Sequence, residues 1–230
     1  MGILIKAIFF DLDGTLTDIS KREIHAIHDT AKHFGLKVSK AQVKQLHDNI
    51  MMNLSSYSDI YKALGLTLTD EVVEYWASAF VKRYRLSIPR RCTKSALEAL
   101  SQTYKLFCVT SRESLAEVKL ELDFLGLEKS FDYIVTREVA AKHFRLHSLS
   151  FTPFQEQRRK LYECALAMAD YHPNQVLVVG DMASELEPAK GMGMTTIGLL
   201  TEKGKETELR KVSDHLIPNI THLKTILEVK

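Results

Sequence analysis

The 230-residue sequence is poor in cysteine, has almost no excess charge and lacks long apolar runs. Its three cysteines, Cys92, Cys108 and Cys164, are scattered without the spacing of a metal site, which predicts reduced thiols in a cytoplasmic protein. Lys and Arg number 31 against 29 Asp and Glu, and a net charge of +2 gives no reason to expect nucleic acid or an anionic membrane as a partner. No uncharged apolar run approaches the length of a membrane span.

The apolar segment near the N-terminus contains Lys6, stops at Asp11 and has no small-residue cleavage pattern. We therefore interpret it as a strand rather than a signal peptide. The sequence has no internal repeat and no low-complexity segment. With 45% hydrophobic and 26% charged residues it is typical of a soluble globular protein, and its length suits one domain with a second one inserted.

Short apolar runs alternate with helical periodicities through most of the chain. These runs lack polar alternation, as expected of strands that are covered on both faces. Strands that alternate with helices predict an α/β fold with a doubly wound parallel sheet, whose ligands bind at the carboxyl ends of the strands. The expected strands are Leu4–Phe10, Lys105–Thr110, Asp132–Thr136, Gln175–Gly180 and Thr195–Leu199.

Residues 19–88 interrupt this alternation with helical patterns only. Two capping-box patterns, Ser20–Glu23 and Ser39–Gln42, each open a helix, and a third helix is expected over Thr69–Leu86. Successive helices without a strand between them predict a separate helical domain, inserted between the first and second strands of the sheet. The predicted domains are residues 1–18 with 89–230 for the α/β core and residues 19–88 for the insertion.

The most informative segment is Ile8–Thr17, which reads IFFDLDGTLT. Strand alternation is expected to point Asp11 and Asp13 the same way at the end of a buried strand, with Leu12 pointing into the protein. Two neighbouring carboxylates repel each other unless a cation or a shared proton relieves them, so the pattern predicts a metal site or acid–base chemistry. Gly14 lets the chain turn and its amide approach a ligand closely.

Two further strands also end in polar side chains. Gln175–Asp181 reads QVLVVGD and carries Asp181 at its tip, four residues before Glu185 at the start of a helix. The strand that begins at Lys105 ends in Thr110 and Ser111. Because all these residues fall at carboxyl ends of predicted parallel strands, we expect them to meet at one edge of the sheet.

Together these motifs resemble the signature of the haloacid dehalogenase superfamily, most of whose members are magnesium-dependent phosphatases. The helical insertion resembles the cap of its phosphoglycolate phosphatase-like branch. The resemblance implies a Rossmann-like catalytic core, an inserted cap domain, and Mg²⁺-dependent hydrolysis of a small phosphorylated metabolite, a phosphate monoester, through an aspartyl-phosphate. We expect a cytoplasmic monomer or homodimer without nucleic-acid or membrane partners.

The resemblance also implies a role for each residue that matches the family motifs. Asp11 matches the nucleophile and Asp13 the acid/base, and an acid at position 13 argues against dehalogenation because the true dehalogenases lack one there. Thr110 matches the hydroxyl that donates to the phosphate. The implied phosphate-binding residues are Gly14, Thr15, Thr110 and Ser111. The implied Mg²⁺ ligands are Asp11, Asp13 through its backbone carbonyl, Asp181, and Glu185 either from behind the ligands or through water.

The family's catalytic lysine is the one motif residue that this sequence does not place directly. Relatives often carry Lys-Pro before the helix that precedes the Gly-Asp strand, and this chain has no Lys-Pro. Counting forward from the third strand gives Lys142, which we predict for this role. Counting back from Gly180 favours Lys160 or Arg158 instead, in a helix that a capping box at Thr152–Gln155 is expected to open.

Other functions remain open at this stage. The same aspartyl-phosphate could serve a phosphomutase or a phosphonatase. The missing Lys-Pro also leaves room for a non-catalytic binding module that retains the fold. A receiver-type phosphoacceptor is disfavoured by the helical insertion and by the D-x-D-G-T string.

Overall fold

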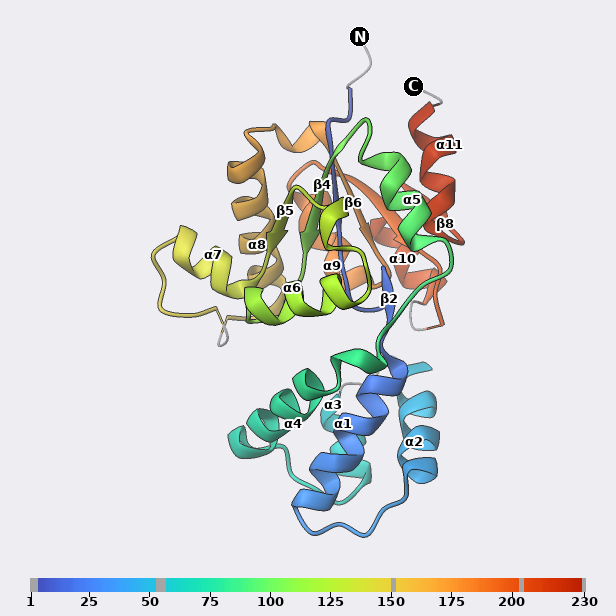
Figure 1. The fold of residues 1–230 in the computed structure, drawn as a ribbon, viewed down its shortest axis with the longest axis vertical. Helices are drawn as coiled ribbons and strands as arrows, with labels where there is room; N and C mark the ends of the chain where they lie inside the picture. Colours follow the sequence, from blue (N-terminus) through green and yellow to red (C-terminus); the bar gives the residue numbers. More distant parts are fainter. Residues whose placement is uncertain (1–3, 53–56, 150–151, 203–204, 229–230) are drawn as a thin grey trace. The chain divides into compact units, whose positions relative to one another are not determined.

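The chain forms two compact units, both drawn in Figure 1. We call Met1–Thr17 with Pro89–Lys230 the core unit and Asp18–Ile88 the helical unit. Two short strands, β2 (Thr17–Asp18) and β3 (Ile88–Pro89), pair with each other where the chain passes between the units. The computed structural model describes residues 4–52, 57–149, 152–202 and 205–228.

The core unit is built on a six-stranded parallel sheet in the order β5-β4-β1-β6-β7-β8. The α/β class and the doubly wound parallel sheet predicted from the sequence are confirmed. The last strand was not predicted, because three residues at a sheet edge give too short a pattern to recognise. The strands are β1 (Ala7–Phe10), β4 (Lys105–Val109), β5 (Tyr133–Val135), β6 (Val176–Gly180), β7 (Thr195–Leu199) and β8 (His215–Ile217).

Side chains of the central strands alternate between two apolar layers. Ile8 and Phe10 of β1 pack in one layer, and Ala7 and Phe9 in the other. This alternation matters for the site, because it directs Asp11, the next residue after Phe10, to the layer of Phe9. The layer of Phe10 contains α5 (Thr93–Leu100), α6 (Leu115–Phe124) and α11 (Leu223–Glu228). The layer of Phe9 contains α7 (Arg137–His143), α8 (Phe154–Ala169), α9 (Ala183–Gly191) and α10 (Glu206–Val212).

The helical unit has its own small apolar core. Ile27, Val43, Ile60 and Val72 are buried together, one from each of its helices. Arg22 is also buried there, with its guanidinium stacked 3.7 Å from the centre of the Phe80 ring. The helices are α1 (Ser20–His33), α2 (Lys40–Met52), α3 (Tyr57–Ala63) and α4 (Asp70–Lys82), followed by a 3₁₀ turn at Tyr84–Leu86.

Of the three predicted capping boxes, one is present and two are absent, although a helix begins close to each of them. The Ser39–Gln42 box is present, since the Ser39 N–H donates to the Gln42 side chain at 2.9 Å and the Gln42 N–H donates to the Ser39 hydroxyl at 3.3 Å. Ser20 is instead the first residue of its helix, and its N–H donates to the Asp18 carboxylate. Helix α8 begins after Pro153 without a side-chain cap.

Within the described ranges, no helix combines the length and apolarity that crossing a bilayer requires. The three cysteines are free thiols. Cys108 and Cys164 are buried, whereas Cys92 is exposed.

Candidate active site

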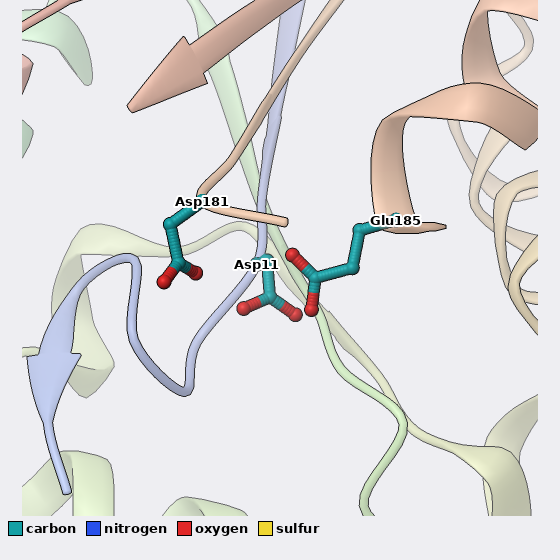
Figure 2. A group of neighbouring side chains, drawn as sticks. All are labelled: Asp11, Asp181 and Glu185. Carbon is teal, nitrogen blue, oxygen red and sulfur yellow. The ribbon is translucent and has the colours of Figure 1, made fainter. Parts of the chain in front are cut away.

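Three buried acids meet at the carboxyl edge of the sheet. Asp11 follows β1, Asp181 follows β6, and Glu185 lies in the first turn of α9. Strands β1 and β6 are parallel neighbours, so the residues that follow them lie side by side. One carboxylate oxygen from each residue lies within 4.8 Å of the others, and Figure 2 shows Glu185 reaching from its helix toward Asp11.

This acidic cluster is poorly compensated by the protein itself. Asp11 Oδ2 and Glu185 Oε2 are buried and accept no hydrogen bond. Burial, opposed by the charge of Arg158 and reinforced by that of Asp181, raises the pKa of Asp11 to about 7. Burial, followed by the charge of Asp11, also raises the pKa of Glu185 well above its usual range. Such a cluster of oxygen donors with unsatisfied charge fits a hard divalent cation.

Asp181 is held in place by hydroxyls from two loops, one after β1 and one after β7. Thr15 donates its hydroxyl to Asp181 Oδ1 at 2.9 Å, and Thr201 donates to Oδ2 at 3.0 Å. Gly14 adopts φ +94°, and a Cβ at this position would lie 2.5 Å from Asp181 Oδ2. The glycine is therefore required both by its backbone angle and by the close approach of the carboxylate.

Gly14 and Thr15 both have hydrogen-bond partners within the protein. The Gly14 N–H donates to the Thr17 carbonyl at 2.9 Å, so it closes the turn. The Thr15 hydroxyl is engaged by Asp181. In this structure the Gly14 amide and the Thr15 hydroxyl bind partners within the protein, and the phosphate-binding role of both residues stays a prediction.

A buried arginine supplies positive charge at Asp11. Arg158 of α8 donates from Nη1 to Asp11 Oδ1 at 3.1 Å and to the Val109 carbonyl at 3.3 Å. Its Nη2 donates to the Tyr162 hydroxyl at 2.8 Å, and that hydroxyl donates to the Glu185 carbonyl at 3.0 Å. Only about 1% of the Arg158 side chain is exposed, so the Arg158–Asp11 pair is shielded from water.

The two lysines considered for this position lie elsewhere. Lys142 is 75% exposed and pairs with Glu138 one turn earlier on α7 at 2.7 Å. Lys160 places its ammonium 5.4 Å from the centre of the Phe144 ring. Counting forward from β5 failed because α7 and the segment after it intervene before α8. Of the three candidates, the structure brings only Arg158 to Asp11.

Asp13 has different partners from Asp11. We expected both carboxylates to point the same way, but β1 ends at Phe10 and Asp13 already belongs to the following turn. Its two oxygens accept from Nε and Nη2 of Arg112, with 2.7 Å for the Nε contact. Arg112 also pairs with Glu121 of α6, which is wholly buried. Asp13 therefore contributes no side-chain oxygen to the acidic cluster.

Sequence reasoning missed Arg112 and Glu121, although both left a signal. Arg112 is the second residue after Thr110, at the tip of a predicted strand. Glu121 lies between Val118 and Leu122, on the apolar side of its helix. A charged residue in such a position indicates a buried ion pair.

The expected phosphate-binding hydroxyls lie at the same edge of the sheet. Thr110 is buried after β4, and its hydroxyl accepts from the Arg112 N–H at 3.3 Å. Ser111 accepts from Arg158 Nη1 at 3.5 Å. The helix that follows begins only at Leu115 and is capped by Ser114, so the amides beside Thr110 belong to a loop rather than to a helix start.

Comparison with known proteins identifies the family. Residues 8–199 match the model of the haloacid dehalogenase-like hydrolases. A phosphoglycolate phosphatase from Aquifex aeolicus is 30% identical over 199 residues, covering 84% of this chain and 83% of that protein. The pyrophosphatase PpaX of Bacillus mycoides is 24% identical and covers 97% of each chain.

A solved structure supports the same fold. A haloacid dehalogenase-like family hydrolase from Streptococcus pneumoniae superposes with a TM-score of 0.74 at 22% identity, covering 98% of this chain and 99% of that one. The chain belongs to the haloacid dehalogenase-like hydrolase family. The family membership and the enzyme class predicted from the sequence are thereby confirmed.

Proposed function

We propose that this protein is a Mg²⁺-dependent phosphatase that hydrolyses a small phosphate monoester through an aspartyl-phosphate. The observation that carries the proposal is the buried cluster of Asp11, Asp181 and Glu185, with Arg158 bound to Asp11. Two of its oxygens lack partners, as expected of a site that is completed by a cation and a substrate.

The residues that would hold Mg²⁺ are Asp11, the Asp13 backbone carbonyl and Asp181, with Glu185 either behind them or acting through water. The donors are oxygens, which Mg²⁺ prefers, and few enough to leave positions for water and a phosphate oxygen. When bound, the ion supplies positive charge that offsets the repulsion between the anionic phosphoryl group and the carboxylates.

Asp11 is the proposed nucleophile. One of its oxygens, Oδ1, is held by Arg158, whereas Oδ2 accepts no hydrogen bond. An Asp11 oxygen forms a bond to phosphorus in line with the leaving oxygen, and the bond from phosphorus to that oxygen breaks. This covalent step divides one difficult hydrolysis into two easier ones.

Asp13 is the proposed acid/base. It donates a proton to the leaving oxygen in the first step. In the second step a water molecule attacks phosphorus, and Asp13 accepts a proton from this water. The bond between phosphorus and the Asp11 oxygen breaks, which releases phosphate and restores the Asp11 carboxylate. Proton transfer by a positioned side chain contributes typically about 10²–10⁴-fold to such rates.

Arg158 takes the place that we first gave to Lys142. Its guanidinium contacts both the nucleophile and Ser111, and it is fixed by Tyr162. A planar guanidinium can contact a carboxylate and a phosphate at the same time, since it carries five donors. We therefore propose Arg158 as the cation that aligns the nucleophile and the phosphoryl group.

The size of the substrate is inferred from the relatives, whose names point to small phosphorylated compounds. One is named as a phosphatase for phosphoglycolate, an ester, and the other as a pyrophosphatase, which cleaves an anhydride. The helical unit is the proposed cap that selects the leaving group. Phosphomutase and phosphonatase activities, and a non-catalytic binding role, are the alternatives that the test below must separate.

The test is the release of phosphate from p-nitrophenyl phosphate, phosphoglycolate and pyrophosphate, with Mg²⁺ and with EDTA. Asp11→Asn is the matched variant, because it keeps the shape and removes the nucleophile. We expect hydrolysis that EDTA abolishes and that Asp11→Asn lowers by about 10⁴-fold or more.

Other outcomes would point elsewhere. A well-folded wild type that releases no phosphate from any ester would favour a binding module. Little release of free phosphate, with isomerisation of a sugar phosphate that requires an activating bisphosphate, would favour a mutase. Trapping of a substrate imine by borohydride would favour a phosphonatase.

A further inference from the structure

Asp13 is the outermost member of a chain of three charged side chains that continues into the protein interior. Arg112 contacts both oxygens of Asp13 through Nε and Nη2, and contacts Glu121 through Nη1 and, at 3.4 Å, through Nη2. Side-chain exposure falls along the chain from 24% for Asp13 to 13% for Arg112 and 0% for Glu121. The acid at the mouth of the site is thus tied to a carboxylate that has no contact with water.

Glu121 is an unusual residue for its position. Its neighbours on α6, Val118 and Leu122, are wholly buried apolar side chains of the core. A buried ion pair commonly adds little stability compared with apolar residues of the same volume, because both charges lose their hydration. A gain in stability therefore does not account for a carboxylate here, whereas the need to fix a guanidinium does.

The contacts of the Arg112 guanidinium fix the orientation of the Asp13 carboxylate. Glu121 accepts from Nη1 and, at 3.4 Å, from Nη2, whereas Nε and Nη2 both donate to Asp13, so Glu121 and Asp13 hold the guanidinium from two sides. Two parallel contacts hold a carboxylate in one plane, whereas a single contact allows it to turn. The second arginine of the site, Arg158, has no described bond to Asp13: its partners are Asp11, Tyr162, Ser111 and the Val109 carbonyl.

We propose that Arg112 and Glu121 are positioning residues that orient the Asp13 carboxyl for proton transfer to the leaving oxygen. This inference rests on the proposed function, in which Asp13 is the acid/base. Arg112 acts through Asp13, and Glu121 acts through Arg112. Neither residue is needed to attack phosphorus, so their loss lowers the rate most where the leaving oxygen needs a proton.

The experiment compares two aryl esters of similar size. The leaving group of phenyl phosphate needs protonation, whereas that of 2,4-dinitrophenyl phosphate departs as an anion. The quantity measured is kcat/KM, which reports the steps up to transfer of the phosphoryl group to Asp11. For Arg112→Ala we expect kcat/KM to fall about 10- to 100-fold more for phenyl phosphate than for the dinitrophenyl ester.

Two conservative variants keep the test decisive if Arg112→Ala folds poorly. Arg112→Lys retains the charge but makes only a point contact with Asp13. Its kcat/KM for phenyl phosphate should therefore fall less than that of Arg112→Ala, but still more than its kcat/KM for the dinitrophenyl ester. Glu121→Gln removes the charge that holds Arg112 and is expected to act in the same direction. Arg137→Ala is the control, because the Arg137 side chain pairs with Glu113 at 3.0 Å and has no described bond to Asp11, Asp13, Asp181 or Glu185. The Arg137 N–H, which donates to the Arg112 carbonyl at 3.0 Å, is retained in this variant.

Equal losses on both esters, or no loss in Arg112→Ala, would overturn the positioning role. A leaving-group effect of the same size in Arg137→Ala would overturn it as well. These outcomes are distinct from failure of the proposed function, which would be seen as a wild type that hydrolyses neither ester.

Discussion

Asp11 and Asp13 are two residues apart in sequence, yet their surroundings differ in kind. The carboxylate of Asp11 is buried among other acids, retains an oxygen without a partner and has a raised pKa. The carboxylate of Asp13 is a quarter exposed and has both oxygens paired with one guanidinium. The surroundings of Asp11 leave negative charge that a bound cation can neutralise, whereas the guanidinium at Asp13 fixes the orientation of that carboxylate. The predictions that follow test this difference.

Among the variants that compare these two environments, the largest effect is expected from removing the Arg158 guanidinium that contacts Asp11. Arg158→Ala leaves the nucleophile without its only described basic partner and should lower kcat by about 10²–10³-fold, as loss of one charge-stabilising donor commonly does. Arg158→Lys should lower kcat less, because it keeps the positive charge. It should still lower kcat, because a lysine cannot contact Asp11 and Tyr162 at the same time. Steady-state kinetics on p-nitrophenyl phosphate measures both. A kcat within about threefold of wild type in Arg158→Ala would show that Asp11 does not depend on this arginine.

An intermediate effect is expected on stability without metal. The pKa of Asp11 is raised from 3.8 to about 7, so between these values the folded state binds a proton that the unfolded state has released. Stability therefore falls as pH rises through this range. In EDTA, the wild type should lose several degrees more of Tm between pH 5 and pH 7.5 than Asp11→Asn does, since 1 kcal/mol corresponds to about 2–4 °C in a protein of this size.

Thermal melts of the two proteins in matched buffers make this measurement, and the difference between them cancels the titration of groups that do not interact with Asp11. Addition of Mg²⁺ at pH 7.5 should raise the Tm of the wild type more than that of the variant. Identical pH dependence in the two proteins would show that Asp11 is not destabilised by its surroundings.

The smallest effect is expected at Lys142. Its ammonium is exposed and bonded to Glu138 on the same helix, a pair that water screens and that adds little stability. Lys142→Ala should keep kcat within about twofold of wild type and change the free energy of unfolding by less than about 0.5 kcal/mol. A hundredfold loss of kcat with unchanged folding would restore Lys142 to the role that motif counting gave it.

The strand-tip residues were the part of the site that could be predicted. Asp11 and Asp181 each end an apolar segment, and parallel strands bring such ends to one edge, so their meeting follows from local pattern and sheet topology alone. The same reasoning found Thr110. It could not say that Thr15 would bond to Asp181, because this contact depends on the path of the loop after β1.

The basic partners were predicted poorly. Arg158 is 147 residues from Asp11, and it reaches the site because α8 packs on the face of the sheet to which Asp11 points. Motif spacing placed the cation on α7, whose solvent side carries Lys142. Arg112 and Glu121 were overlooked because neither forms a motif with Asp13 in the sequence.

The family, the parallel sheet and the gathering of acids at its edge follow from local sequence patterns, because an apolar run that ends in Asp identifies both a buried strand and its carboxyl end. The pairing of each arginine with its acid follows from packing between distant elements. Which acid an arginine contacts depends on where its helix or loop packs and on how far its long side chain extends. Neither can be predicted from the spacing of residues along the sequence.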